Sequence, residues 1–105
     1  MKNKLTKKDI AKIEKETVFS VEEDEECYRF SWYTNAGEDF SFDIWKDEED
    51  IIDAIKQYCF NFDVEEHVKI WFGANRGEPS LRELLDDAEE IEKQLGTLAY
   101  VVENL

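Results

Sequence analysis

Between residues 17 and 46, apolar and polar side chains alternate in three separate segments. A period of two places every second side chain on the same face of a strand. An acidic run at 22–26 and a stretch of turn-forming residues at 34–39 separate the segments. We therefore expect three strands in an antiparallel meander whose buried face is formed by these residues: Phe19, Val21, Tyr28, Phe30, Trp32, Phe40, Phe42 and Ile44.

The apolar residues outside this region follow the helical period. A capping box over residues 6–9 predicts a short basic helix that ends near residue 16. Apolar residues at helical spacing from Leu81 to Val102 predict a long last helix, in which Gly96 marks a bend or a close crossing. The residues from 73 to 79 are expected to break the preceding helix. The predicted helices begin at residues of the types that cap helix N-termini: Thr6, Asp47, Asp63 and Ser80.

These patterns predict an α+β fold with a short N-terminal helix, a three-stranded antiparallel meander, and two or three helices packed on one face. We expect a single acidic domain over 1–105, with the basic helix in 1–16, the strands in 17–46 and the helices in 47–105. A chain of this length supports one hydrophobic core. That core is expected to contain Phe30, Phe42, Ile55, Trp71, Leu84 and Ile91.

Charge is distributed unevenly along the chain. Its 105 residues include 27 acids and 13 bases, for a formal net charge of −14. Residues 1–16 carry six Lys and three acids, so residues 17–105 carry seven bases and 24 acids. Nucleic acids and anionic lipids are bound mainly through Lys and Arg. We therefore expect no direct binding to nucleic acid or membrane. Because no apolar run reaches the ~18 residues of a membrane span, we also expect a soluble, intracellular protein.

Few residues are suited to catalysis or to metal binding. His67 is the single histidine, and we expect it at the edge of the core. Cys27 and Cys59 are too few and too far apart for a zinc site, and are expected to be reduced core thiols. The acidic stretch 43–50 lacks EF-hand spacing, and the glycines of 73–77 fit no phosphate-binding loop. We expect a protein that is not an enzyme, with no catalytic residue, metal or cofactor.

Carboxylates recur on the last predicted helix at i, i+3, i+4 and i+7, on the side opposite the apolar stripe. Side chains at such spacings lie ~5–6 Å apart, comparable to the phosphates along a nucleic-acid strand, so we expect a continuous acidic ridge. Further acidic clusters occur at 22–26, 38–39, 47–50 and 63–66. The residues predicted to bind a partner are Glu83, Asp86, Asp87 and Glu90 of the ridge, together with Asp47, Glu48 and Asp50.

This acidity has two interpretations as a binding protein, and a third interpretation is an enzyme. The first is an inhibitor that mimics DNA and occupies the groove of a basic nucleic-acid-binding protein. The alternative is a generic acidic interaction or scaffold module whose charge serves solubility. Mimicry predicts acids on one continuous face, whereas solubility predicts acids spread evenly. A small hydrolase that uses clustered carboxylates would need an acid with a strongly perturbed pKa in a concave pocket.

Two segments in the second half of the chain are similar in sequence to a group of known proteins. The sequences FDVEEHVKIW at 62–71 and GEPSLRELLDDAEEI at 77–91 resemble short acidic proteins of phages and mobile elements in Gram-positive bacteria. The resemblance implies an inhibitor of the anti-CRISPR or antirestriction type. Such a protein would act in the cytoplasm of the bacterial host cell on a Cas effector or a restriction enzyme. The resemblance implies no site at the level of residues.

Overall fold

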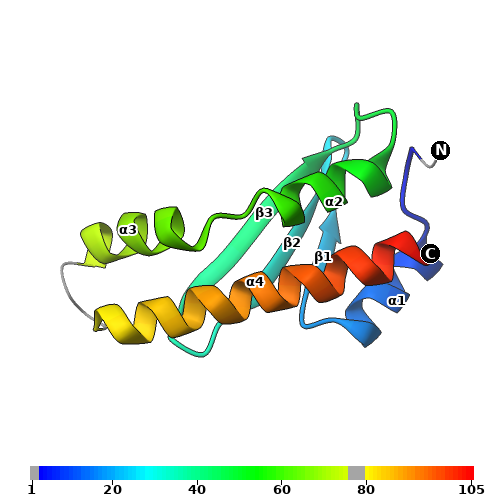
Figure 1. Cartoon of the computed structure of the whole chain (residues 1–105). Helices are drawn as coiled ribbons and strands as arrows, with labels where there is room; N and C mark the ends of the chain where they lie inside the picture. The colour runs from blue at the N-terminus through cyan, green and yellow to red at the C-terminus, as the bar shows by residue number, and fades with distance from the viewer. Residues whose placement is uncertain (1–2, 76–79) are drawn as a thin grey trace.

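The computed structural model describes residues 3–75 and 80–105 and has a mixed α+β fold (Figure 1). A short N-terminal helix precedes a three-stranded antiparallel sheet of order β1-β2-β3, and the other helices follow, which confirms the predicted fold class. Within the described residues, no helix combines the length and the apolar composition that crossing a membrane requires. The elements are α1 (Lys7–Glu16), β1 (Ser20–Glu23), β2 (Cys27–Tyr33), β3 (Asp39–Trp45), α2 (Ile51–Phe60), α3 (Val64–Asn75) and α4 (Leu81–Glu103).

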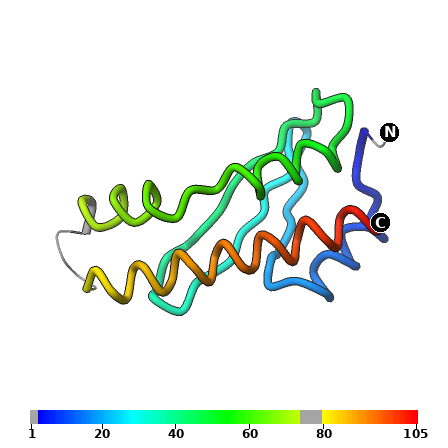
Figure 2. Tube along the Cα trace, in the orientation of Figure 1, coloured from blue at the N-terminus to red at the C-terminus, as the bar shows by residue number. Residues whose placement is uncertain are grey.

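The strand register places the alternating apolar side chains on one face of the sheet. Phe30 on β2 lies opposite Val21 on β1 and opposite Phe42 on β3, and the rings of Phe30 and Phe42 stack with centroids 5.0 Å apart. Helices α2 and α4 lie across this face (Figures 1 and 2). On the opposite face, exposed Arg29 donates to the cross-strand Asp43 carboxylate at 2.8 Å. The sheet therefore has one buried face and one wet face, as expected.

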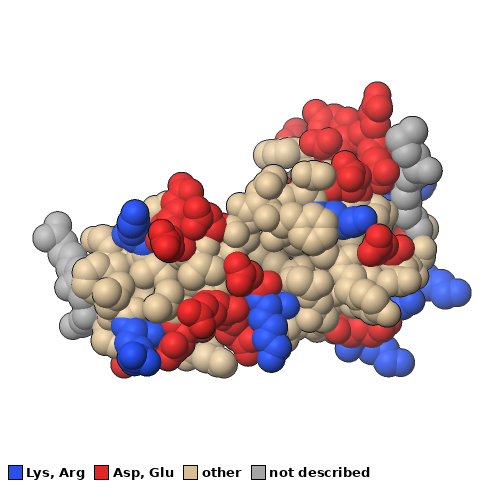
Figure 3. Space-filling view, viewed as in Figure 1, with Lys and Arg blue, Asp and Glu red and all other residues tan. Residues whose placement is uncertain are grey.

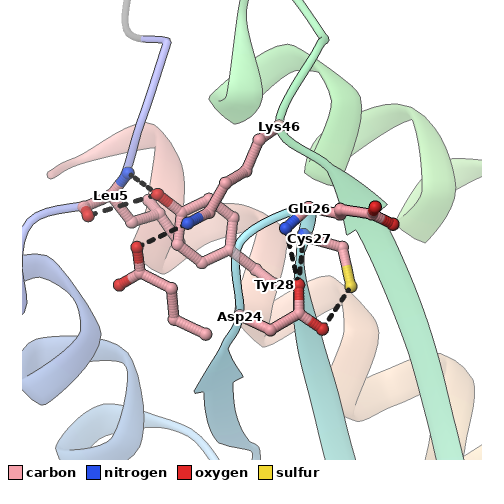
Figure 4. A network of polar contacts seen from close by, with 7 residues as sticks. Leu5, Asp24, Glu26, Cys27, Tyr28 and Lys46 are labelled. Carbon is pink, nitrogen blue, oxygen red and sulfur yellow. Dashed lines mark hydrogen bonds and ion pairs between the residues drawn. The ribbon is translucent and has the colours of Figure 1, made fainter.

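The main core lies between the sheet and helices α1, α2 and α4. The Tyr28 hydroxyl is buried there and accepts a hydrogen bond from the Leu5 N–H at 2.9 Å (Figure 4), which holds the residues before α1 against β2. Burying such side chains is the main source of folding free energy. The fully buried side chains of the main core include Ile13, Phe19, Phe30, Ile51, Ile55, Ile91, Leu95 and Leu98.

A second apolar cluster lies apart from the main core, so the prediction of a single core is wrong. This distal cluster consists of buried Val68, Leu84 and Ala88, with partly buried Val64 and Trp71 packed against it. Helix α3 and the first turns of α4 extend beyond the sheet (Figures 1 and 2), so their apolar side chains pack on one another. We call this pair of helix segments the distal arm. The molecule is elongated, with extents of 42 × 24 × 21 Å and a radius of gyration of 14.3 Å.

The helix boundaries confirm some sequence signals and correct others. Thr6 forms the predicted capping box, and the Ser80 side chain accepts from the Glu83 N–H at 3.2 Å. Helix α2 begins later than predicted, because Asp50 caps it by accepting from the Asp53 N–H at 3.2 Å, and Asp47 stays in the preceding connection.

The interior of two helices also differs from prediction. Gly73 lies within α3, so the helix continues past the predicted break, and the remainder of that break at 76–79 lies outside the described residues. On α4, Leu81 and Leu85 are exposed, so the apolar stripe is not continuous at its start. A Cβ at Gly96 would meet nothing within 4 Å, so no close crossing requires glycine there.

Candidate functional site

The tip of the β2–β3 hairpin is held between two helices. On one side, the Asp87 carboxylate of α4 accepts a hydrogen bond from the Ala36 N–H, with Oδ1 3.3 Å from the nitrogen. On the other side, Glu38 Oε2 lies 2.9 Å from Nε2 of His67 on α3. Gly37 between them has φ of 90°, a left-handed conformation that favours glycine. The tip thus connects the sheet to both helices of the distal arm.

An acidic groove of about 610 Å³ runs between this hairpin tip and α4. Among the described residues that line it, there are five carboxylates and one ammonium group, that of Lys93. Because α4 rises about 1.5 Å per residue, Glu83 and Glu90 are separated by about 10 Å along the helix axis. The groove therefore presents a row of negative charge. The lining residues are Asn35, Ala36, Glu83, Asp86, Asp87, Glu89, Glu90 and Lys93.

The groove brings together all four acids that the sequence places on the ridge, but the ridge is not continuous. Glu83 and Asp86 are exposed and Glu90 is partly exposed, whereas Asp87 is only 4% exposed. Asp87 interrupts the predicted ridge because the hairpin tip lies over this position, and the Ala36 N–H donates to one of its carboxylate oxygens. The other oxygen, Oδ2, has no hydrogen-bond partner among the described residues. The four acids therefore form the wall and floor of a groove.

The second predicted group of partner-binding acids lies elsewhere. Asp47 and Glu48 are exposed in the connection between β3 and α2, and the Asp50 carboxylate caps α2. This connection follows Trp45 at the end of β3, whereas the groove lies beside the hairpin at the beginning of the strand. A strand of this length spans about 20 Å. The structure does not bring the two predicted groups together.

The acidic surface is divided into patches on the face that Figure 3 shows. Acidic side chains gather over the distal arm and, separately, over the connection between β3 and α2, with uncharged surface between them. Lysine and arginine side chains interrupt the acids on the same face. This face therefore shows neither one unbroken acidic surface nor an even spread of acids.

His67 lies in aromatic surroundings at the edge of the main core. Its ring centroid is 5.2 Å from that of Phe62 and 5.9 Å from that of Phe40, and its side chain is 19% exposed. With Tyr58, these residues line a hollow of about 240 Å³. Burial raises the pKa of Tyr58 above its usual value. The contact of His67 with Glu38 connects α3 to the hairpin, and this positioning role agrees with the expected place at the core edge.

The two cysteines are buried and form no disulfide. Burial raises the pKa of the Cys59 thiol to about 12. Burial also raises the pKa of Cys27, and the nearby carboxylates of Asp24 and Asp43 raise it further. Both shifts disfavour the reactive thiolate, which agrees with the expected role as core thiols. Figure 4 shows Cys27 beside Asp24, whose carboxylate accepts from the N–H groups of Glu26 and Cys27 at 2.7 and 2.8 Å.

In residues 3–75 and 80–105, no three His, Cys, Asp or Glu side chains are grouped so that they could hold a metal ion. No protein-family model, curated protein or solved structure matches the chain.

Sequence reasoning missed several members of the site. Asn35 and Ala36 join the groove only because the hairpin tip folds onto α4, and a turn-forming segment gives no signal of what it will contact. Lys93 lies three residues after Glu90 on the same helix, and Glu89 lies three residues after Asp86, so helical spacing already places both beside the predicted acids. The partner of His67, Glu38, lies 29 residues earlier, beyond any local pattern.

Proposed function

We propose that this protein is a non-enzymatic inhibitor that binds the basic nucleic-acid groove of a host-defence nuclease by mimicking DNA. The proposed partner is a Cas effector or a restriction enzyme in the cytoplasm of a bacterial host. The observation that carries the proposal is the row of carboxylates that lines the groove along α4. Such a partner offers a groove rich in Arg and Lys that normally holds phosphates.

The geometry of this row supports mimicry. Glu83, Asp86 and Glu90 follow one another at steps of about 4.5 and 6 Å along the axis of α4. One strand of duplex DNA carries a charge about every 3.4 Å, so the charge density of the row is of the same order. Like charges at such spacings destabilise a helix by a few tenths of a kcal/mol per pair. A basic partner would relieve that repulsion, and would be attracted from a distance.

A second function, a generic acidic interaction module whose charge serves solubility, is favoured by one specific observation. The acids in Figure 3 lie in separate patches, with uncharged and basic residues between them. A charge pattern of this kind keeps a small domain soluble without any shaped interface. The two functions differ in whether the position of the acids matters or only their number.

The proposed function can be tested with the whole protein as bait in a bacterial host lysate, followed by competition with duplex DNA. We expect a captured nuclease to lose its DNA when the inhibitor is added, and the inhibition to weaken steeply as salt rises. The decisive variant reverses the exposed and partly exposed acids of the groove, as E83K/D86K/E90K. It leaves Asp87 in place, because reversing a buried carboxylate that holds the hairpin would disturb the fold.

The matched control carries the same change in charge at the β1–β2 turn, as E22K/E25K/E26K. These three side chains are exposed, and the control spares Asp24, which holds the turn, and Glu23, which pairs with Lys46 at 2.7 Å. We expect the groove variant to lose inhibition and the control to keep it. Equal losses in the two variants would favour the solubility module, and unchanged inhibition in both would contradict mimicry through acids.

A further inference from the structure

Asp87 is the buried carboxylate of the acidic groove, and its described contacts leave it incompletely satisfied. It is 4% exposed, its Oδ1 accepts from the Ala36 N–H at 3.3 Å, and its Oδ2 has no partner among the described residues. Buried carboxylates are normally paired with a cation or with several donors, because an unpaired charge is costly away from water. A single neutral donor at this distance is a weak counterpart for a carboxylate.

The neighbours of Asp87 on α4 add to its negative charge. Glu83 and Glu90 lie four residues before it and three after it, so both share its face of the helix. Lys93 lines the same groove, but it lies three residues after Glu90 and six after Asp87. Side chains six residues apart do not share a helix face, so Lys93 shares a face with Glu89 and Glu90 and not with Asp87.

From this arrangement we infer that the groove receives an arginine side chain of the partner, whose guanidinium binds Asp87 at the floor and Glu83 or Glu90 at the wall. The inference rests on the proposed function and names the chemical group that the partner inserts. A guanidinium is planar, has five N–H donors, and sheds water more readily than an ammonium does. It can therefore bridge two carboxylates and satisfy a buried one, which a compact ammonium does less well.

Asp87 can meet such a group with little rearrangement. The side chain already lines the groove, and the last torsion of an aspartate has a broad energy well. In the proposed complex, rotation about this torsion turns Oδ2 toward the groove. A guanidinium bound in this way would also contact the hairpin tip, since Asn35 and Ala36 form the opposite wall.

The test is a titration of the ¹⁵N-labelled full chain with acetyl-Arg₃-amide, and separately with acetyl-Lys₃-amide, which carries the same charge. We expect the arginine peptide to bind at least about fivefold more tightly, as bidentate recognition requires. The shifted backbone signals should include Ala36 and Asp87. Equal affinity for the two peptides would overturn the inference, because it would mean attraction by charge alone.

The variant D87N keeps the shape and an acceptor for the Ala36 N–H, but it replaces the carboxylate by a neutral amide. We expect it to bind the arginine peptide about tenfold more weakly, whereas the control E25Q, an exposed neutralisation outside the groove, stays close to wild type. If D87N does not fold, E83Q/E90Q removes the wall charges without changing the floor and should show a similar loss. Binding as strong as in E25Q by the folded D87N, or by E83Q/E90Q, would refute the assignment.

The outcomes also separate this inference from the proposed function. If the arginine peptide binds the groove but the protein displaces no DNA from a nuclease, the groove assignment stands and DNA mimicry fails. If the protein displaces DNA and D87N does so equally well, mimicry stands and the arginine site is wrong.

Discussion

Replacing Leu95 by alanine should separate the stability of the sheet from that of the distal arm. Leu95 is fully buried in the main core, where α4 packs against the sheet and α2, whereas α3 is fastened to α4 by the distal cluster. A local opening that releases α3 exposes the distal cluster and leaves Leu95 buried. Such an opening is expected to require less free energy than global unfolding, because few buried apolar residues oppose it.

The magnitude follows from what the substitution removes. Leucine to alanine deletes three carbon atoms, which at about 0.8 kcal/mol each gives roughly 2.4 kcal/mol of lost burial. A side chain at 0% exposure within a large cluster also leaves a cavity, so we expect a total of about 3–4 kcal/mol. A domain of this size has a free energy of unfolding of about 5–15 kcal/mol, so the variant should remain folded.

Native-state hydrogen exchange at residue resolution measures both openings. In L95A, amides of β2 and β3 should exchange roughly 10²- to 10³-fold faster, since they require global unfolding, while amides of α3 should keep their wild-type rates. The companion variant L84A changes the distal cluster itself, and should accelerate exchange in both regions because both openings lose the Leu84 contacts. If α3 and the sheet accelerate together in L95A, the two clusters unfold as one unit and the reasoning fails.

Three further outcomes are expected. Gly96→Ala should raise the free energy of unfolding by about 1 kcal/mol in urea denaturation, because a Cβ there meets open space in the interior of a helix; a loss of stability would reveal an unrecognised need for glycine. Cys27 and Cys59 should react with an aromatic disulfide reagent at pH 8 only as the protein unfolds. Because the pKa of Cys59 is raised from 9.0 to about 12, the contribution of the neutral, buried thiol to the free energy of unfolding is complete below pH 9. That contribution should be lost as pH rises toward 12. Two backbone N–H groups lower the pKa of Asp24 below 3.8, so its contribution is present above pH 3.8 and is lost as pH falls below that value; the urea midpoints of wild type and Asp24→Ala should differ more at pH 7 than at pH 3.

The fold could be predicted because its signals are local. Alternating aromatic residues determine which face of each strand is buried, and the charged and turn-forming segments determine where the strands end. The caps at Thr6 and Ser80 are complete within four residues of sequence. The start of α2 could not be predicted to the residue, because Asp47 and Asp50 are both good capping residues. Only the folded structure determines that Asp50 caps the helix.

The site could be predicted only in part, because its closure is long-range. The spacing of Glu83, Asp86 and Glu90 follows from the helix alone, and the groove contains all three. The burial of Asp87 depends on Ala36, which is 51 residues away, and no periodicity encodes that contact. Helical spacing also shows that Trp71 is on an apolar face without showing which apolar residues that face will meet, so the division into two clusters could not be foreseen.

The elongated outline has a hydrodynamic consequence. A compact chain of 105 residues has a radius of gyration of about 13 Å, whereas this one has 14.3 Å and is twice as long as it is thick. Together with a net charge of −14, this shape should make the monomer elute from a gel-filtration column ahead of spherical standards of the same mass. An early peak is therefore no sign of a dimer, and the mass of 12.5 kDa has to be measured by light scattering or sedimentation equilibrium.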